Sequence, residues 1–382
     1  MDTVERLLSD LVAIDSVNPS LVPGAAGEAA VARRLVAEFE AIGLAVDVQE
    51  VAPGRPNVVA TLDGRRPGRS LMLCGHIDTV GVAGMAAPFD PVVTGGRLYG
   101  RGAQDMKSGV AAMIDAVRAV AQGGGLDAGS VIVACVVDEE HSSIGADALV
   151  TRWRADAGVV TEPTDLDIAV CHKGFAWGQV TTTGRAAHGS RPADGVDAIV
   201  HMGRVLVALG DLDRRLQAGA RHPLLGPASL HASIISGGRE LSSYPDRCTL
   251  QVERRTLPGE PLAQLDDELR EILARASAAD ATFSAEATAL FARPPYAIDP
   301  AHPLPGLLGR AAGAAGCRAA TIGMSFWTDA AVLGEAGIPS VLFGPTGAGL
   351  HGVEEWVDLA SVRQCRDALA SLVRAWCAGG QA

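Results

Sequence analysis

The sequence has few aromatic residues, no excess of positive charge and almost no lysine. Only 4% of its 382 residues are aromatic, and 44 acidic residues against 32 basic ones give a net charge of −12. Lys107 and Lys173 are its only lysines. Nucleic-acid surfaces need clustered basic residues, and base stacking needs aromatic side chains. The composition therefore argues against a nucleic-acid partner.

The sequence also lacks an apolar run of 18 residues and paired cysteines, and we expect no leader peptide in its first residues. Charged residues interrupt the apolar periodicity of residues 1–14, as in an amphipathic helix. We therefore expect no membrane partner and a cytoplasmic location. An odd, dispersed set of cysteines without a CxxC pair indicates buried thiols in a reducing compartment. The cysteines are Cys74, Cys135, Cys171, Cys248, Cys317, Cys365 and Cys377.

The chain is long enough for two domains, and its first part has the pattern of an α/β domain. Up to residue 175, short and nearly all-apolar strands alternate with helices, which indicates a mixed sheet covered by helices on both faces. Helices are predicted at 27–42 and 108–121, and strands at 71–74, 131–137 and 157–160.

From about residue 176 the pattern changes to strands with alternating apolar and polar residues. The order βαββαβ predicts an α+β, ferredoxin-like domain with helices on one face of a single sheet. Its strands are predicted at 176–183, 228–235, 247–255 and 281–290, and its helices at 196–217 and 260–277.

After Pro294–Pro295 the first pattern returns, with predicted helices at 303–316, 328–336 and 359–377. We therefore expect a catalytic domain in two segments, residues 1–175 and 291–382. A dimerisation or lid domain of residues 176–290 interrupts it.

Five clusters of acidic and imidazole side chains follow apolar strands or lie where loops meet helices. In α/β sheets, ligands bind beyond the carboxyl ends of the strands. One such residue is usually structural, but five clusters at this kind of position predict a built site. The clusters are CGHID (74–78), GRGAQDMKSG (100–109), VVDEE (136–140), VVTEP (159–163) and LHGVEEW (350–356).

The first two clusters contain His76, Asp78 and Asp105. Residues i and i+2 of an extended chain point to the same side, so Asp78 can accept from the second imidazole nitrogen of a metal-ligating His76. The alternative is a satisfied histidine beside a capping Asp. Asp105 can direct one oxygen toward each of two cations, or it simply caps the helix that begins near Ser108. Lys107 is better explained as a local charge partner than as a catalyst.

The other clusters supply Glu139, Glu140, Glu162 and His351. Adjacent side chains diverge, so one glutamate after the strand can ligate metal while the other faces a reacting water as general base. Two imidazoles and three carboxylates without thiolate suit zinc, with cobalt or manganese as possible substitutes. Two metals with a bridging Asp and a bridging water would polarise a carbonyl and generate hydroxide at neutral pH.

In combination, these motifs resemble the di-zinc exopeptidase and deacylase family. Its members include acetylornithine deacetylase, succinyl-diaminopimelate desuccinylase, glutamate carboxypeptidase and aminoacylase. The resemblance spans nearly the whole chain and rests on GHIDTV, GRGAQDMKSG, DEE, TEP, GRAAHGSRPADGVDAI, ERRTLPGE and LHGVEEWV.

The resemblance implies a role for each residue of the clusters. Glu139 matches the general base and Asp78 the acid that orients a ligand. The metal ligands that it implies are His76 and Glu162 for one zinc, Glu140 and His351 for the other, and Asp105 as the bridge between them.

The resemblance assigns two further residues to the inserted domain. His188 matches a histidine that reaches across a homodimer to stabilise the tetrahedral oxyanion. Arg255 matches an arginine that grips the substrate carboxylate. Strand parity supports this choice independently. In residues 247–255 the apolar positions alternate, which leaves Arg255 on the polar face and Arg254 on the core face.

The sequence thus predicts a metal-dependent hydrolase that cleaves the amide bond of an N-acyl amino acid. A metal-bridging water, activated by Glu139, would attack the carbonyl. A carboxypeptidase or dipeptidase, acting on a short peptide, would use every residue named and stays open. Many relatives have Asn where SSYPD (242–246) places Ser242 or Ser243, so their acyl and side-chain preferences cannot be assumed for this chain. A di-metal phosphoesterase is disfavoured because Arg255 is the only placed basic anchor.

Overall fold

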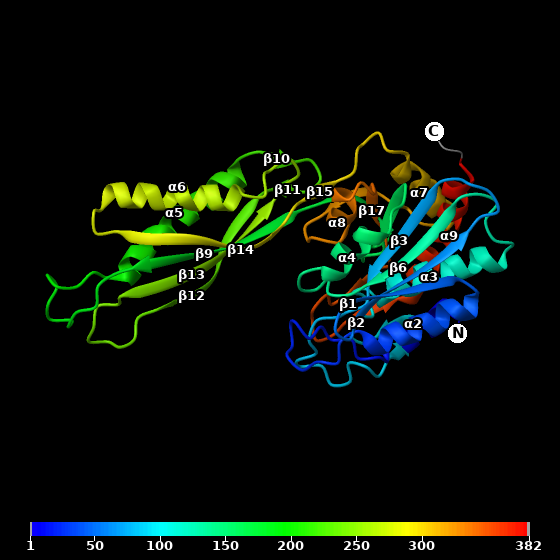
Figure 1. Ribbon diagram of the computed structural model, residues 1–382, viewed down its shortest axis with the longest axis horizontal. Coiled ribbons are helices and arrows are strands. Elements are labelled where there is room, and N and C mark those ends of the chain that lie inside the picture. Colours follow the sequence, from blue (N-terminus) through cyan, green and yellow to red (C-terminus); the bar gives the residue numbers. More distant parts are fainter. Residues whose placement is uncertain (1, 380–382) are drawn as a thin grey trace. The chain divides into compact units, whose positions relative to one another are not determined.

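The structure is a computed structural model that describes residues 2–379, and it divides into two compact units (Figure 1). The inserted unit comprises Cys171–Ala297 and Gly323–Trp327. The discontinuous unit comprises Met1–Val170, Ile298–Ile322 and Thr328–Ala382. Within residues 2–379, no helix is both long and apolar enough to cross a membrane.

A mixed sheet forms the centre of the discontinuous unit, as predicted. The strand order is β1–β2–β6–β3–β7–β17–β8. The central strands β6, β3, β7 and β17 are parallel, whereas β1, β2 and β8 are antiparallel to their neighbours. The bounds are β1 Ala45–Ala52, β2 Arg55–Asp63, β3 Ser70–His76, β6 Ser130–Val136, β7 Ala157–Val160, β8 Ile168–His172 and β17 Ser340–Leu342.

Three of the parallel strands end at the same edge of this sheet. In the register, Cys74 of β3 lies beside Ala134 of β6 and Val160 of β7. Each strand is a run of apolar residues, which the buried centre of a parallel sheet requires, followed at once by polar residues. The polar clusters that follow the three strands are therefore neighbours, although 89 positions separate Cys74 from Pro163.

Helices cover both faces of the sheet. α2 (Ala29–Ile42) packs on the face that carries Val48 and Pro56. α4 (Ile144–Arg152) packs on the opposite face, where Asn57 donates to the carbonyl of Gly145. α2 contacts α3, which packs against α1 and α9, and α4 contacts α8. The remaining bounds are α1 Thr3–Val12, α3 Lys107–Gln122, α7 Pro303–Ala314, α8 Ala330–Glu335 and α9 Leu359–Ala378.

A small antiparallel sheet brings two distant motifs together. Its strand order is β18–β19–β5–β4. Tyr99, the last residue of β5, pairs with Trp356, the first residue of β19. The segment that starts at residue 100 and the segment that ends at residue 355 therefore leave the ladder at the same end. The bounds are β4 Val92–Thr94, β5 Arg97–Tyr99, β18 Gly347–Ala348 and β19 Trp356–Asp358.

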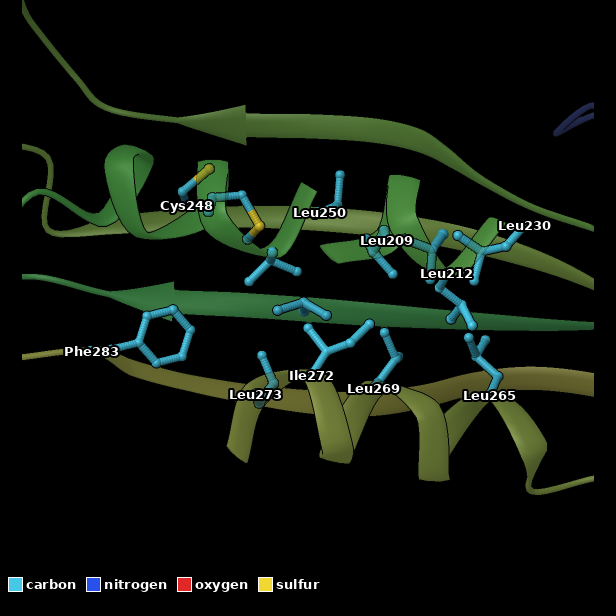
Figure 2. Packing of buried hydrophobic residues seen from close by; sticks show 14 of the residues in the cluster. Leu209, Leu212, Leu230, Cys248, Leu250, Leu265, Leu269, Ile272, Leu273 and Phe283 are labelled. Carbon is cyan, nitrogen blue, oxygen red and sulfur yellow. The ribbon is translucent and has the colours of Figure 1, made fainter. Parts of the chain in front are cut away.

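The inserted unit has the predicted βαββαβ order. Four antiparallel strands form one sheet in the order β12–β13–β9–β14, and α5 and α6 cover one of its faces. Side chains such as Leu209, Leu250 and Leu269 form a buried apolar core between the sheet and the helices (Figure 2). The bounds are β9 Gly174–Thr183, α5 Ala198–Ala218, β12 Ser229–Gly237, β13 Arg247–Thr256, α6 Gln264–Ala279 and β14 Ser284–Arg293.

The strands that the sequence did not predict are mostly short. β8 has five residues, and the strands of the small sheet have two or three, too few for an alternating pattern to be detected. The same holds for β10 Arg221–His222, β11 Gly226–Pro227, β15 Tyr296–Ala297 and β16 Thr321–Met324. The expected bounds 176–290 fall inside the inserted unit, and the division into a catalytic and a lid domain stays a prediction.

Candidate metal centre

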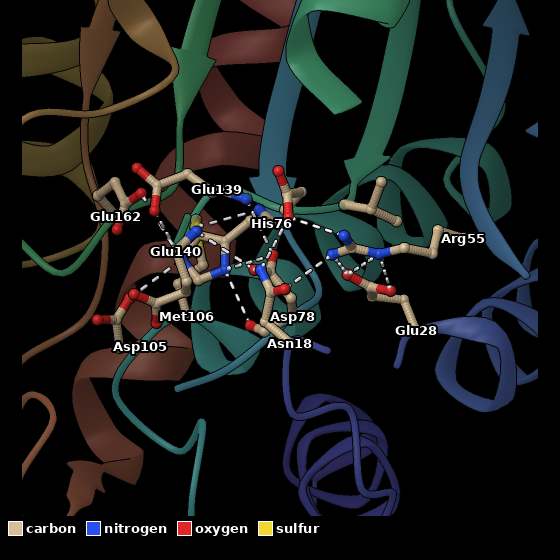
Figure 3. A network of polar contacts seen from close by, with 12 residues as sticks. Asn18, Glu28, Arg55, His76, Asp78, Asp105, Met106, Glu139, Glu140 and Glu162 are labelled. Carbon is tan, nitrogen blue, oxygen red and sulfur yellow. Dashed lines mark hydrogen bonds and ion pairs between the residues drawn. The ribbon is translucent and has the colours of Figure 1, made fainter. Parts of the chain in front are cut away.

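The aligned strand ends carry candidate ligands. β3 ends at His76, the turn after β6 carries Glu139 and Glu140, and Glu162 follows β7 (Figure 3). Close packing of α3 behind this edge depends on Gly109, where a Cβ would lie 1.9 Å from the carbonyl oxygen of the residue before Glu162. Only glycine allows this approach of helix and strand.

Asp105 lies between the two imidazoles. Its Oδ1 is 3.1 Å from Nε2 of His76, and its Oδ2 is 3.4 Å from Nε2 of His351. Glu140 lies on the His351 side, with Oε2 3.0 Å from the same Nε2. Each oxygen of one carboxylate therefore faces a different imidazole, which is the arrangement that a bridging ligand needs.

Glu139 and Glu162 also approach Nε2 of His76, the ring nitrogen that faces Asp105. Nε2 of His76 is 3.9 Å from Oε1 of Glu162 and 4.0 Å from Oε2 of Glu139. Among residues 2–379, two groups of donor atoms, each within 4.8 Å, could hold a metal ion, and they share His76. One group adds Glu139 and Glu162, and the other adds Asp105 and Glu140.

Asp105 is not the N-cap of α3. The helix begins at Lys107, its N-cap residue is Met106, and no side chain caps it by a hydrogen bond. The alternative explanation of Asp105 as a helix cap is therefore wrong. Nζ of Lys107, instead of pairing with a carboxylate, donates to the carbonyls of Leu11 at 2.9 Å and Ile14 at 2.7 Å, and so secures the end of α1.

The three glutamates of the site carry more negative charge than the neighbouring imidazoles can compensate. Burial, followed by repulsion from neighbouring acids, raises the pKa of Glu139 and Glu162 well above the usual value and that of Glu140 to about 7. Within residues 2–379, the salt-bridge partners of these glutamates are the imidazoles of His76 and His351. Oε1 of Glu140 is buried and has no hydrogen-bond partner.

The pKa values of the two imidazoles are raised as well, but by their carboxylate neighbours and not by burial. Burial alone would lower the pKa of His76, but its hydrogen bond to Asp105 raises it well above the usual value. The hydrogen bond to Asp105, followed by that to Glu140, raises the pKa of His351 to about 10. The buried carboxylates and the orphaned oxygen of Glu140 fit a divalent cation, since one would compensate their charge, and the nitrogen and oxygen donors suit such an ion.

Asp78 ties the end of β3 to the turn after β6. Its Oδ1 accepts from the backbone N–H of Glu139 and its Oδ2 from that of Glu140, both at 3.2 Å. Nδ1 of His76 donates to the backbone carbonyl of Asp78 at 3.0 Å, whereas the carboxylate is 3.6 Å away. The carbonyl of Asp78 therefore takes the place that the sequence suggested for its carboxylate, and the carboxylate holds the glutamate turn.

Glu355 plays the same part for the loop of Asp105. Its carboxylate accepts from the backbone N–H groups of Gly102 at 3.1 Å, Gln104 at 2.8 Å and Asp105 at 3.1 Å. Nη1 of Arg101 donates to it at 2.6 Å. Glu355 belongs to the motif LHGVEEW (350–356), in which only His351 was predicted to have a role. The pattern that could have indicated a role for Glu355 is an acidic residue in the same motif as the candidate ligand His351.

Two non-glycine residues of the centre have a left-handed backbone, Asp138 with φ 70° and His351 with φ 57°. Such conformations persist only where surrounding contacts hold them, and they gather at functional sites. In the loop of His351, Gly349 has φ 94°, and a Cβ there would lie 1.9 Å from the carbonyl oxygen of Glu354. Glycine is required for the tight loop that presents this imidazole.

The other two predicted residues lie in the inserted unit. His188 is exposed, and its Nδ1 is 2.8 Å from Oγ of Ser190. The segment of Ser242 and Ser243 pairs with the loop of His188: the N–H of Gly189 donates to Ser242 at 2.7 Å, and His188 forms a β-bridge with Ser243. The serines that replace the expected Asn are thus neighbours of this histidine.

Arg254 and Arg255 lie on opposite faces of β13, which confirms the prediction from strand parity. Arg254 is 1% exposed and forms ion pairs with Glu260 and Glu268. Arg255 lies on the other face, where Nε donates to Oε1 of Glu253 at 2.7 Å and the guanidinium lies 5.5 Å from the ring centre of Phe175.

Comparison with known proteins agrees with the resemblance in the motifs. The peptidase family M20/M25/M40 matches residues 72–375. An acetylornithine deacetylase from Proteus mirabilis (strain HI4320) is 30% identical over 99% of this chain and 97% of its own length. The N-formyl-4-amino-5-aminomethyl-2-methylpyrimidine deformylase of Bacillus subtilis (strain 168) is 27% identical over 88% and 86%.

Among solved structures, a tripeptidase from Staphylococcus aureus subsp. aureus mu50 has the same fold. Its TM-score is 0.83 at 23% identity, and the match covers 99% of this chain and 98% of that one. The sequence match and the shared fold confirm an enzyme of the peptidase and deacylase type. The chain belongs to the peptidase family M20/M25/M40.

Proposed function

We propose that this enzyme cleaves the amide bond of an N-acyl amino acid. The observation that carries the proposal is the placement of Asp105 between His76 and His351, with Glu139 beside His76. The relative from Proteus mirabilis, whose name is acetylornithine deacetylase, supports deacylation over nearly the full length of both chains.

The donor set supports two divalent ions, with zinc as the proposed metal and cobalt or manganese as substitutes. His76 and Glu162 would hold one ion, Glu140 and His351 the other, and Asp105 would contact both. Bound there, the ions would supply the Lewis acidity that polarises an amide carbonyl and makes water more acidic.

Glu139 is the proposed general base. Oε2 of Glu139 lies 4.0 Å from Nε2 of His76, beside the proposed metal positions, where this carboxylate would accept a proton from the attacking water. The same carboxyl group then delivers the proton to the leaving amine. Asp78 holds the backbone N–H of Glu139, so it fixes the direction from which this base acts.

Two residues of the inserted unit complete the proposal. Arg255 would bind the substrate carboxylate with the guanidinium N–H groups that Glu253 leaves available, since Glu253 occupies only Nε. Nδ1 of His188 contacts Ser190, which leaves Nε2 to stabilise the oxyanion of a tetrahedral intermediate. We assign this histidine to the active site of the partner subunit.

A homodimer through the inserted unit is part of this proposal. β12 is an edge strand, and edge strands with unpaired backbone groups readily add another strand. It exposes Ile234 at 61% and Ile235 at 52%, and the adjacent α5 exposes Val200 at 57% and Val207 at 67%. Exposed apolar side chains on neighbouring elements are typical of a subunit interface.

The cytoplasm is the proposed location. All seven cysteines are free thiols, and six of them are buried. Unpaired buried thiols are typical of proteins from reducing compartments.

The proposal is tested by a hydrolysis screen with the zinc-loaded and the cobalt-loaded enzyme. Substrates are N-acetyl, N-succinyl and N-formyl amino acids, with dipeptides and tripeptides for the alternative of a peptidase. We expect the highest kcat/KM on an N-acyl amino acid and at least a tenfold lower value on its methyl ester or amide, because these lack the carboxylate that Arg255 binds. If the enzyme prefers unacylated dipeptides, the proposed deacylase function is wrong and the enzyme is a peptidase.

A further inference from the structure

A buried polar network extends from Asp78 to the loop after α1 and to β2 (Figure 3). Its other members are Asn18, Glu28, Arg55 and Asp138, and none of these residues is more than 8% exposed. The proposed mechanism uses none of these four residues. Their burial raises the question of what the network holds in place.

Asn18 uses the whole hydrogen-bonding capacity of its side-chain amide. Nδ2 donates to Oδ2 of Asp78 at 2.8 Å and to Oδ1 of Asp138 at 3.1 Å. Oδ1 accepts from Nη2 of Arg55 at 3.1 Å and from the backbone N–H of Ser20 at 2.8 Å. The amide orientation is determined by these partners, because the reverse orientation would set an oxygen against two carboxylates.

Arg55 uses all three nitrogens of its guanidinium. Nε and Nη2 donate to Glu28, Nη2 also to Asn18, and Nη1 lies 2.8 Å from Oδ1 of Asp138 and donates to Ser20 at 3.0 Å. The pKa of Arg55 lies above its usual range, because the bonds to Glu28 outweigh the effect of burial. A planar guanidinium can reach these partners together, whereas a single ammonium cannot.

Asp138 connects the network to the glutamate turn. Its backbone is left-handed, with φ 70°, and Oδ2 accepts from Oγ of Ser142 at 2.6 Å. Glu139 and Glu140 follow directly, and their N–H groups bind the carboxylate of Asp78. The turn is therefore held from two sides, and Asn18 is the only residue of the network that contacts both Asp78 and Asp138.

We propose that Asn18 and Arg55 are positioning residues of the metal centre. They hold Asp138 in its left-handed conformation and Asp78 in its orientation, so that Glu139 faces His76 while Glu140 faces His351. The inference rests on the proposed function for the roles of these two glutamates. Neither Asn18 nor Arg55 is one of the proposed metal ligands, and the contacts that carry the proposal are to Asp78, Asp138 and Glu28.

The test uses Asn18→Ala and Arg55→Lys in the full-length enzyme. Steady-state kcat and KM are measured on the best substrate of the screen. Separately, the affinity of the metal-free protein for zinc is measured by titration against a competing chelator. Changes behind a metal ligand cost about 10–100-fold in affinity or activity. We expect kcat or zinc affinity to fall by this factor, with KM changed by less than about threefold.

Arg118→Lys is the matched control. Arg118 is also largely buried, and it pairs with Glu38 on α2 and Asp115 on α3. The same substitution at this position should lower the Tm to a similar extent while leaving kcat and zinc affinity at wild-type values. A loss of fold stability alone would therefore look the same in the control and in the test variants.

The inference is overturned if Asn18→Ala and Arg55→Lys equal Arg118→Lys in both kcat and zinc affinity. If Asn18→Ala does not fold, Asn18→Ser and the charge-preserving Arg55→Lys decide the question. If the wild-type enzyme hydrolyses nothing in the screen, the proposed function fails by itself. The zinc affinities of the variants still decide whether the network positions the metal centre.

Discussion

The sheet edge of the discontinuous unit and the sheet of the inserted unit combine charge and burial in different ways. At the edge, Glu139, Glu140 and Glu162 are close to one another and largely shielded from solvent, and their pKa values rise as a result. In the inserted unit the charged side chains are distributed by strand parity, with Arg254 in the core and Arg255 on the opposite face.

The contrast between the two regions shows that stability and function can oppose each other or can be assigned to separate residues. Like charges buried at the edge destabilise the metal-free fold, so the feature that would bind metal opposes folding. On β13, neighbouring residues serve stability and function separately: Arg254 forms ion pairs in the core, and Arg255 is available for the proposed substrate. Side chains of a strand alternate between its faces, which makes this separation possible. The predictions below test whether the two units differ in this way.

The largest effect is expected from Glu139→Gln. Loss of the general base should lower kcat by about 10²–10⁴-fold, with metal binding retained. The Tm of the metal-free protein should stay equal or rise, because the change removes a buried charge. Kinetics and thermal unfolding of the metal-free protein measure the two quantities. Glu286→Gln, at an exposed position of β14, is the control. Activity within tenfold of wild type would remove Glu139 from the role of base.

The next prediction asks whether the inserted unit acts on the partner subunit. His188→Ala and Glu139→Ala subunits are each expected to be nearly inactive. When they are mixed and allowed to exchange, half of the dimers contain one complete site, and activity should rise to about a quarter of the wild-type value. Mixed dimers, confirmed by a mass tag on one subunit, that show no recovery would place His188 outside the partner's site.

The neighbouring arginines of β13 should give opposite results. Arg255→Gln removes a hydrogen-bonded charge from the proposed carboxylate site, so KM should rise by about 10–100-fold at unchanged stability. Arg254→Met leaves Glu260 and Glu268 without their partner, so the free energy of unfolding should fall by about 3–5 kcal/mol with KM unchanged. KM and urea unfolding of both variants test the contrast. If both variants change KM and the free energy of unfolding by the same amounts, strand parity does not separate substrate binding from stabilisation of the fold.

The smallest effect concerns His172, the buried last residue of β8. Burial lowers its pKa to about 4, and its Nδ1 lies 3.0 Å from the carbonyl oxygen of Lys173. The unfolded chain takes up this proton below about pH 6.5, so the contribution is complete above that pH and is lost as the pH falls toward 4. At pH 5 the loss is about 2 kcal/mol.

His172→Phe should reduce this acid dependence, because phenylalanine carries no titratable group. The free energy of unfolding is measured by urea at pH 7.5 and pH 5 for both proteins. The metal ligands titrate in both, so the difference between the two proteins isolates His172. Parallel pH curves for wild type and variant would contradict the buried neutral histidine.

The sequence was sufficient for the main elements because their signals are local. The apolar run of β3 ends at His76, and the alternation in β13 separates Arg254 from Arg255, both of which are visible in a few residues. The helix predicted at 27–42 corresponds to α2, which begins at Ala29 and ends at Ile42.

What the sequence did not reveal depends on contacts between distant segments. Asn18 donates to residues 60 and 120 positions away, and Glu355 binds N–H groups about 250 positions away. A carboxylate that binds backbone amides has no sequence pattern of its own, unlike a carboxylate that follows an apolar strand. Asp329, a further buried acid whose charge raises the pKa of Glu139, was missed for the same reason.

The discontinuity of the first unit has a consequence for synthesis. Chains emerge from the ribosome with the N-terminus first, and domains fold as units. The inserted unit is nearly complete once residue 297 has emerged, whereas Asp105 must still wait for His351 and Glu355. The segments that carry His351 and Glu355 are thus translated after nearly all of the inserted unit, so the proposed second metal position lacks an imidazole until then. Maturation of this centre is tied to translation of the last segment.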